Sequence, residues 1–494
     1  MRYSLLCIVF CVIAFHAAAG YEYQYNARCR NAYKHFMSLH LNEGRAEIQE
    51  ELRQNPNNLM AVYIADYEDC LLLLLNGNKA DFNLKKAHFE ERLDLLDKGD
   101  EKDPWYRLCK AGIYLHWAMV HMRFEENMKA TFQFRKSFLL LKENKRIFPD
   151  FEYNNIYYGT EQALAGALPE KYKWLASLFG IKGDVKKGTG LITSFLGSHS
   201  YNDLFQYEAA VFACYLQLYM LYQKDEVWAY INSDQYPAQN NLLLSFVKAN
   251  IALNTRRAEA ALQTMKAIQS DPYYNIFPMT HYELGSAYYY KADPACIPHL
   301  QQFVNKYKGS MFIKDAWQKM ALMYFLQRNT TQANACRAKI ASVGNTIADV
   351  DIQAQRFGQD KKWPNFVLLY VHLLIDGGYH QLAIDKLDNY KEADFPDVVD
   401  KVEYNFRLAR AYDEMNNDNK AIQLYQHTIN LGKGRKEQFA ARSALQMALI
   451  YERVGMKQEA IKRFNEALSM RNHDFQGAID QQAKAGLNRL GASS

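Results

Sequence analysis

The stretch Leu408–Tyr425 reads LARAYDEMNNDNKAIQLY, and Met447–Phe464 reads MALIYERVGMKQEAIKRF. In the first half of both, a large apolar residue, an alanine and a tyrosine hold the same positions. In the second half, an alanine, an isoleucine and an aromatic residue do. Spacings of three and four residues place each set on one face of a helix. The turn residues NNDN at 416–419 separate the halves of the first stretch. Each stretch therefore predicts two antiparallel helices that pack through the shared residues.

The small residue near the start of the second helix recurs through the C-terminal half of the chain. Counted backwards, with steps of 39, 38, 50, 37 and 35 residues, it lies at Ala460, Ala421, Ala383, Ala333, Cys296 and Ala261. A period in this range is typical of a solenoid of stacked helix pairs. The sequence therefore predicts an all-α fold, a right-handed superhelix of antiparallel helix pairs over at least residues 245–470. The step of 50 contains an insert at about 342–362, expected to be an extended loop between repeats or a distorted turn of the solenoid.

The segment WQKMALMY at 317–324 fits the tetratricopeptide-repeat pattern W-x2-L-G-x2-Y, with methionine and alanine in place of leucine and glycine. The chain resembles the tetratricopeptide-repeat (TPR) superfamily most clearly from about residue 280 to 470. The resemblance is weaker at 242–280, where the aromatic residue of the pattern is missing. It implies a TPR-like α-solenoid that binds a protein or peptide partner on a concave face lined by the first helix of each pair.

The register of the repeats predicts which residues of the first helices face that concave surface. The exposed inward positions are expected to include Phe406, Arg410, Asp413, Arg442, Leu445 and Glu452. TPR families that grip a C-terminal carboxylate carry lysine and asparagine where this chain has Phe406 and Arg410, so that clamp is not expected. A groove of mixed charge with an aromatic residue can hold an extended peptide or a partner helix. Ordinary solvated helix surface explains the same residues equally well.

The N-terminal half, 20–240, is also helical in pattern but less regular. A helix is expected to begin at Asp103 and Pro104 and to break near Glu125–Asn127. Further on, the segment LPEKYKWLASLFGIKGDVKKGTGLI at 168–192 resembles part of a TPR family that includes the fungal inclusion-body-clearance proteins and related animal proteins. The matching residues are Phe179, Gly180, Gly183, Asp184 and Gly188. The resemblance implies an interaction protein without established enzyme activity, although an export signal sets this chain apart from that family's intracellular roles.

Composition favours long helices in a well-packed chain. The 494 residues include 11 prolines and 24 glycines, fewer than usual, and hydrophobic residues make up 49% of the chain, enough to build a large core. The net charge of +5 is spread along the chain, so no nucleic-acid partner is expected. The six cysteines beyond residue 20 are scattered in apolar helical contexts, which favours buried thiols over a disulfide framework.

The N-terminus has the pattern of a signal peptide. Arg2 supplies the positive start, Leu5–Phe15 is an apolar run too short to span a bilayer, and Ala17–Ala19 offers a cleavage site. We therefore expect a signal peptide at 1–19, an irregular helical region at 20–240 and a TPR solenoid at 241–490. The mature protein is expected to be exported, to the periplasm if the host is a Gram-negative bacterium and otherwise by secretion. No later segment is expected to span a membrane.

No catalytic, cofactor-binding or metal-binding motif is recognisable, so neither an enzyme nor a cofactor is expected. GDVKKGTG at 183–190 lacks the lysine that a phosphate-binding loop carries directly after its second glycine, which favours a structural turn. His116 and His121 are five residues apart and do not share a helix face. The alternative is an enzyme or accessory subunit with a site in the N-terminal half. Its candidate residues, which core packing explains as well, are Tyr153, Tyr157, Tyr158, Glu161 and His199.

Overall fold

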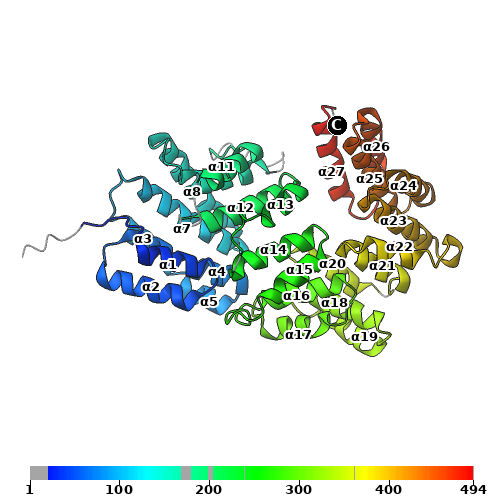
Figure 1. Cartoon of the computed structure of the whole chain (residues 1–494), viewed down its shortest axis with the longest axis horizontal. Helices are drawn as coiled ribbons and strands as arrows, with labels where there is room; N and C mark the ends of the chain where they lie inside the picture. Colours follow the sequence, from blue (N-terminus) through cyan, green and yellow to red (C-terminus); the bar gives the residue numbers. More distant parts are fainter. Residues whose placement is uncertain (1–19, 169–179, 199–203, 239, 361, 493–494) are drawn as a thin grey trace, which may run out of the picture. The chain divides into compact units, whose positions relative to one another are not determined.

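The computed structural model describes residues 20–168, 180–198, 204–238, 240–360 and 362–492, and these residues are almost entirely helical (Figure 1). Within these ranges the β-structure is a single isolated bridge between Glu22 and Asn58. The predicted all-α fold is therefore confirmed. The expected signal peptide at 1–19 lies outside the described residues.

The chain forms two compact units. Unit 1 comprises residues up to 227 together with 234–237, and unit 2 comprises residues 228–233 and everything from 238 onward.

Unit 1 is a bundle of short and long helices around an aromatic core. Its elements are α1 (Ala27–Phe36), α2 (Leu41–Gln54), α3 (Leu59–Ile64), α4 (Asp66–Asn76), α5 (Lys79–Lys85), α6 (His88–Leu96), α7 (Pro104–Arg123), α8 (Asn127–Ile147), α9 (Asn154–Gly166), α11 (Val185–Ser198) and α12 (Gln206–Tyr219), with α13 (Lys224–Ile231) at the boundary. Helix α7 begins where expected, because the Asp103 side chain accepts a hydrogen bond from the backbone N–H of Trp105. The expected break before α8 is also present, since Glu125 adopts a φ of 65°.

Unit 2 is a series of helix pairs. Its elements are α14 (Leu242–Asn254), α15 (Ala258–Ala267), α16 (Met279–Tyr290), α17 (Cys296–Lys306), α18 (Ile313–Leu326), α19 (Thr330–Lys339), α20 (Asp349–Gln359), α21 (Phe366–Gly377), α22 (His380–Leu387), the 3-10 turn η1 (Glu392–Asp394), α23 (Val398–Glu414), α24 (Asp418–Gly432), α25 (Phe439–Arg453), α26 (Lys457–Ser469) and α27 (Gln476–Arg489). Helices adjacent in sequence pack together, as α23 with α24 and α25 with α26 show (Figure 1). This is the architecture of a TPR-like solenoid of antiparallel pairs.

The repeated small residues lie where the two helices of a pair meet. None of the following side chains is exposed to solvent: Ala261, Cys296, Ala333, Ala383, Ala421 and Ala460. Around Ala421 and Ala460 the core is filled by Tyr425 and Phe464, the aromatic residues that the pattern places four positions later. The shared residues of the repeat are thus its packing residues, as predicted.

The insert at 342–362 differs from the expectation of a loop, because it contains helix α20. This helix packs against α18, and its Asp351 carboxylate accepts backbone hydrogen bonds from Phe312 at 2.6 Å and Asp315 at 3.1 Å. Those N–H groups belong to the start of α18, which has no partners for them within the helix. The following helix α21 packs against α16. The insert therefore stabilises the start of α18, the first helix of the α18–α19 pair.

Candidate partner-binding site

Two of the predicted inward residues are not at a surface. The ring of Phe406 on α23 is 5% exposed and lies 5.2 Å from the ring of Phe439 and 6.1 Å from that of Tyr425. Leu445 on α25 is fully buried in the same core. The expectation that these two side chains are exposed was wrong. A first helix packs against its own partner and against the neighbouring pairs, so its apolar face is wider than a single stripe.

The other four predicted residues are polar. Arg410 and Asp413 are buried, so their predicted exposure was wrong too, and Arg442 and Glu452 are half-buried. Asp413 accepts hydrogen bonds from the Tyr425 hydroxyl at 3.0 Å and from Arg453 at 3.4 Å. Glu452 forms a two-bond ion pair with Arg489 of α27, at 2.8 and 2.6 Å. Arg410 and Arg442 lie on α23 and α25 and form the centre of the candidate site.

A group of three arginines, here called the arginine cluster, joins Arg410 and Arg442 to Arg256. Arg256 lies in the turn between α14 and α15, and its guanidinium contacts the Glu414 carboxylate at the end of α23. Arg410 donates a hydrogen bond to the same Glu414 oxygen at 2.7 Å. Glu414 thus shares one negative charge between two guanidinium groups. Asp376 on α21 lies 3.9 Å from Arg256 and is also paired with His372 at 2.9 Å.

Arg442 has weaker partners than the other members of the cluster. Its guanidinium donates to the amide oxygens of Gln438, the residue before α25, and Gln482 on α27, both at 3.4 Å. No carboxylate of the described residues lies within ion-pair distance of Arg442. A neutral oxygen at that distance is a poor acceptor for a cation, so this half-buried charge is only partly compensated.

The electrostatic surroundings confirm that positive charge accumulates here. Burial and then the charge of Arg410 lower the pKa of Arg256 to about 10. Burial and then Arg410 also lower the pKa of Arg442. At neighbouring His380, burial followed by the charges of Arg256 and Arg410 lowers the pKa to about 4, so this imidazole is neutral at pH 7. Each of these groups loses protons more readily because cations face it.

Arg256 and Glu414 were missed by the sequence reasoning because they are 158 residues apart and the repeat register aligns neighbouring pairs only. The one local signal is the glycine pair at the end of α21. Gly378 has a φ of +88°, and a Cβ there would lie 2.1 Å from the carbonyl oxygen of Arg256. Only glycine allows the two turns to approach this closely.

The alternative candidates in unit 1 lead to a different kind of cluster. Tyr157 donates a hydrogen bond to Glu208 at 2.9 Å, and His116 lies between Glu208 at 3.1 Å and Asp66 at 2.9 Å. Each of these four side chains is at least nine-tenths buried. They therefore satisfy one another inside the core and do not face solvent.

Glu161, Tyr153 and Tyr158 are the remaining alternative candidates within the described residues. Glu161 is fully buried, and its surroundings raise the pKa of the carboxyl, first through burial. Tyr153 packs its ring on Trp105, with the ring centroids 4.8 Å apart. Tyr158 lies 6.5 Å from Phe138, measured between ring centroids. His199 lies outside the described residues.

The glycine-rich segment 183–190 is mostly helix, because α11 begins at Val185. Gly188 lies at the crossing of α9 and α11, where a Cβ would approach the Gly159 carbonyl oxygen to 2.4 Å. The glycine therefore serves helix packing. Among the described residues, no group of three His, Cys, Asp or Glu side chains is arranged to hold a metal ion. All six described cysteines are buried and unpaired.

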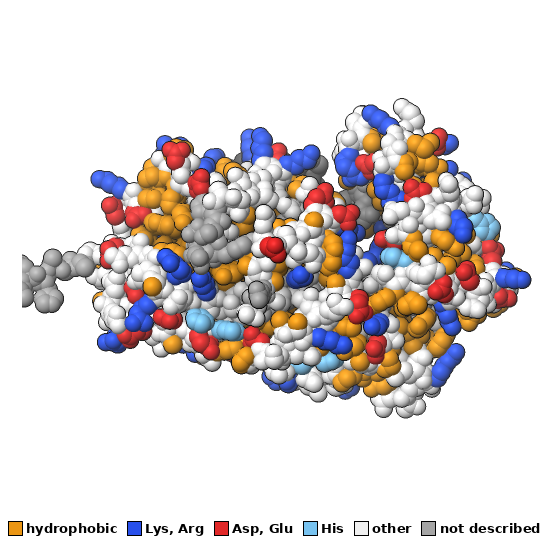
Figure 2. Space-filling view, in the orientation of Figure 1, with side chains coloured by type: hydrophobic (Ala, Val, Ile, Leu, Met, Phe, Trp, Pro, Cys, Tyr) orange, Lys and Arg blue, Asp and Glu red, His pale blue; other side chains and the backbone are white. Residues whose placement is uncertain are grey.

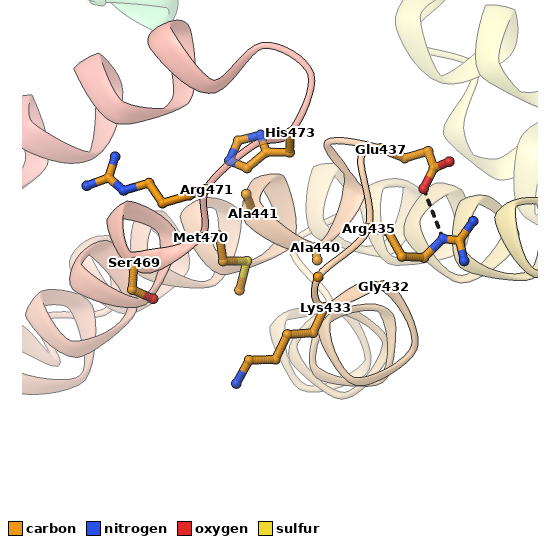
Figure 3. A pocket seen from close by; sticks show the side chains of 11 residues that line it. Gly432, Lys433, Arg435, Glu437, Ala440, Ala441, Ser469, Met470, Arg471 and His473 are labelled. Atoms are coloured by element: carbon orange, nitrogen blue, oxygen red, sulfur yellow. Dashed lines mark hydrogen bonds and ion pairs between the residues drawn. The ribbon is translucent and has the colours of Figure 1, made fainter.

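A pocket of about 200 Å³ lies between the α24–α25 loop and the α26–α27 loop (Figure 3). Its cations point away from its centre: Lys433, Arg435 and Arg471 extend outward in Figure 3. Arg435 is paired with Glu437 at 2.9 Å, and Arg471 is paired with Asp480 at 2.9 Å. Carboxylates already pair with two of its three cations, and the third, Lys433, is exposed, whereas the weakly paired Arg442 is half-buried. This pocket is therefore a weaker anion site than the arginine cluster.

Fold and site together define a TPR-like helical repeat protein. In the face shown in Figure 2, Lys and Arg side chains are interspersed with Asp and Glu. No described helix combines the length and the apolar character needed to cross a membrane.

No protein-family model matches the chain, and no curated protein matches it. Similar solved structures include the apo form of the quorum sensor NprR from B. thuringiensis, with a TM-score of 0.30 and 14% identity over 82% of this chain and 97% of that one. The APC/C hetero-tetramer Cut9–Hcn1 gives a TM-score of 0.27 and 13% identity over 93% of this chain and 89% of that one. The structure of Naa15/Naa10 bound to HypK-THB gives a TM-score of 0.22 and 16% identity over 94% of this chain and 65% of that one.

Proposed function

We propose that this protein is an exported, non-catalytic scaffold that binds a protein partner through the first helices of its C-terminal pairs. The binding face is the side of α23 and α25 that carries Arg410 and Arg442. The observation that supports this most directly is the incomplete pairing of Arg442, whose nearest acceptors are amide oxygens at 3.4 Å. A half-buried cation without a carboxylate lowers stability, and such a group is commonly retained where a partner completes it.

Three further features support the proposal. Solenoids recognise partners along the continuous face that their repeats build. Arginine is enriched among the residues that dominate binding energy at interfaces. The resemblance of 168–192 to a family of interaction proteins points the same way, and the pattern of residues 1–19 supports export.

The test is site-specific photo-crosslinking of the exported protein in its native host. Gln446 lies one helical turn beyond Arg442 on the same face of α25, and Lys462 is an exposed residue on the paired helix α26. A photoreactive residue at 446 is expected to capture the partner, and one at 462 is not.

A second arm uses the double substitution Arg410→Glu with Arg442→Glu in the photoreactive protein. The reversed charges are expected to reduce capture at least tenfold, while the matched change Arg471→Glu leaves it intact. Equal capture from positions 446 and 462, or capture that survives the double substitution, would show that this face is not the site.

A further inference from the structure

The three guanidinium groups of the arginine cluster are unevenly paired with carboxylates. Arg256, Arg410 and Arg442 carry three positive charges, and the acids in contact with them are Glu414 and Asp376. Asp376 is shared with His372. Arg442 is therefore the one member of the cluster that contacts no carboxylate of the described residues.

The cluster also contains hydrogen-bond donors that have no acceptor or only a weak one. Arg410 is 8% exposed, and its Nε is buried without an acceptor. A guanidinium has five N–H donors arranged as a planar fork, which matches the two oxygens of a carboxylate. Arg442 uses its fork on two amide oxygens at 3.4 Å, contacts that an anionic oxygen would replace with shorter and stronger bonds.

The nearby acids do not supply the missing group. Asp413, adjacent to the cluster on α23, accepts a hydrogen bond from the Tyr425 hydroxyl and lies 3.4 Å from Arg453, which pairs more closely with Asp418 at 2.5 Å. Burial raises the pKa of Asp413 in spite of the opposing charge of Arg410. On α25, Glu452 is committed to Arg489. Neither acid contacts Arg442, so an anion that pairs with it must come from outside the described residues.

We propose that the arginine cluster binds a carboxylate of an acidic side chain in an extended segment of the partner, with Arg442 as its principal contact and Arg410 beside it. This inference rests on the proposed scaffold function and names the chemistry of its ligand. The site differs from a clamp for a chain terminus, because the ligand group is a side chain.

Two synthetic peptides test this proposal. One is a fluorescently labelled, capped decapeptide of alternating glutamate and alanine, and the other has every glutamate replaced by glutamine. Fluorescence anisotropy with the full mature protein is expected to show at least tenfold tighter binding of the glutamate peptide. That preference should weaken as salt concentration rises, because it is electrostatic.

Variants locate the binding site. Arg442→Gln is expected to remove the preference for the glutamate peptide, and Arg442→Lys to reduce it, since lysine keeps the charge without the planar fork. Arg471→Gln, which changes an exposed arginine already paired with Asp480, is expected to keep it. The melting temperature of Arg442→Gln should equal or exceed that of the wild type, because a poorly paired cation has been removed. A purely structural role for Arg442 predicts a lower one.

The outcomes separate this inference from the proposed function. Equal binding of the two peptides, absence of binding to either, or a preference that survives Arg442→Gln overturns the carboxylate site, even if crosslinking from position 446 succeeds. A preference that depends on Arg442, together with no partner crosslinked from position 446, supports the anion site and contradicts the scaffold function.

Discussion

At the scale of single residues, His116 is a buried histidine whose two ring nitrogens both face carboxylates. Its imidazole lies between the carboxylates of Asp66 and Glu208, while Arg92 donates to both Asp66 and Asp69. Burial acting alone would lower the pKa of His116, but the hydrogen bonds to the two carboxylates outweigh it and raise the pKa to about 9. The histidine is therefore charged at pH 7 and supplies a counter-ion that the buried acids require.

This environment predicts a pH dependence of stability. The pKa of His116 is raised from about 6.5 unfolded to about 9 folded, so its contribution is fully present below pH 6.5. It is lost as pH rises through 9. The shift corresponds to about 3 kcal/mol. Urea unfolding followed by tryptophan fluorescence should show stability falling between pH 6.5 and 9, and Trp117, hydrogen-bonded to Asp66, provides a local signal.

The substitution His116→Gln should remove this pH-dependent slope and lower the free energy of unfolding at pH 6.5 by about 3 kcal/mol. His427→Gln, which changes a half-exposed histidine paired with Glu392, serves as the control and should leave the slope unchanged. If the His116→Gln variant retains the same slope, another group is responsible for it.

At the scale of helices, close crossings depend on small residues. The predicted destabilising change is Gly188→Ala, because the new methyl group would meet backbone atoms of Gly159 and Ala163 on α9 at 2.4 and 2.5 Å. Gly190 lies on the same helix and has nothing within 4 Å of a Cβ. Gly190→Ala should stabilise by roughly 0.5–1 kcal/mol, and Gly188→Ala should destabilise by about 1–3 kcal/mol. Thermal melting of the two variants measures the difference in stability. Similar shifts in melting temperature would contradict the close crossing of α9 and α11 at Gly188.

A second helix-scale prediction concerns the repeat itself. Ala421→Leu should destabilise unit 2 by about 1–3 kcal/mol, because Ala421 is fully buried between α23 and α24 and the larger side chain forces strain. Ala335→Leu places the same change on an exposed position of the second helix α19. Urea denaturation should show little effect there. Equal losses at both positions would mean that the register is wrong.

The helix pairs of unit 2 could be predicted from the sequence, whereas helix α20 could not. The buried alanines of unit 2 recur at a regular period, so the helix pairs and their contacts could be predicted. Helix α20 breaks the period, and its capping of α18 by Asp351 depends on a contact 36 to 39 residues away. The partner-binding site stays a prediction. Arg410 and Arg442 were identified from the register, whereas Phe406 and Leu445 were misplaced because the register gives direction but not depth of burial.

At the scale of the whole molecule, unit 2 contains contacts that a simple linear solenoid lacks. The Arg256–Glu414 ion pair joins the α14–α15 turn to the end of α23. Nearby, the Tyr379 hydroxyl donates to Glu259 of α15 at 2.9 Å. Ion pairs and a hydrogen bond therefore connect the turn after α14 to the turn after α21, and α23 is connected to both.

Glu414→Gln should test these long-range ion pairs. Both Arg256 and Arg410 lose their shared carboxylate, and a loss of about 1 kcal/mol is expected because these side chains are partly exposed. Hydrogen exchange should quicken in α15 as well as in α23. Glu403→Gln breaks an ion pair with Arg407 inside α23 alone, so its effect should stay local. Unchanged exchange in α15 after Glu414→Gln would contradict a long-range effect of these ion pairs.

The contact between Arg256 and Glu414 also bears on how the unit comes apart. In a linear array of repeats each pair touches only its neighbours, so the ends can unravel one pair at a time. A link across 158 residues couples the α14–α15 turn to the end of α23 in addition to the packing of neighbouring pairs. The pairs beyond α23, which include Arg442, are not held by this ion pair, so we expect them to open at lower cost. The half of the candidate site on α25 would then be the more adaptable one, able to adjust to its ligand while Arg410 stays anchored.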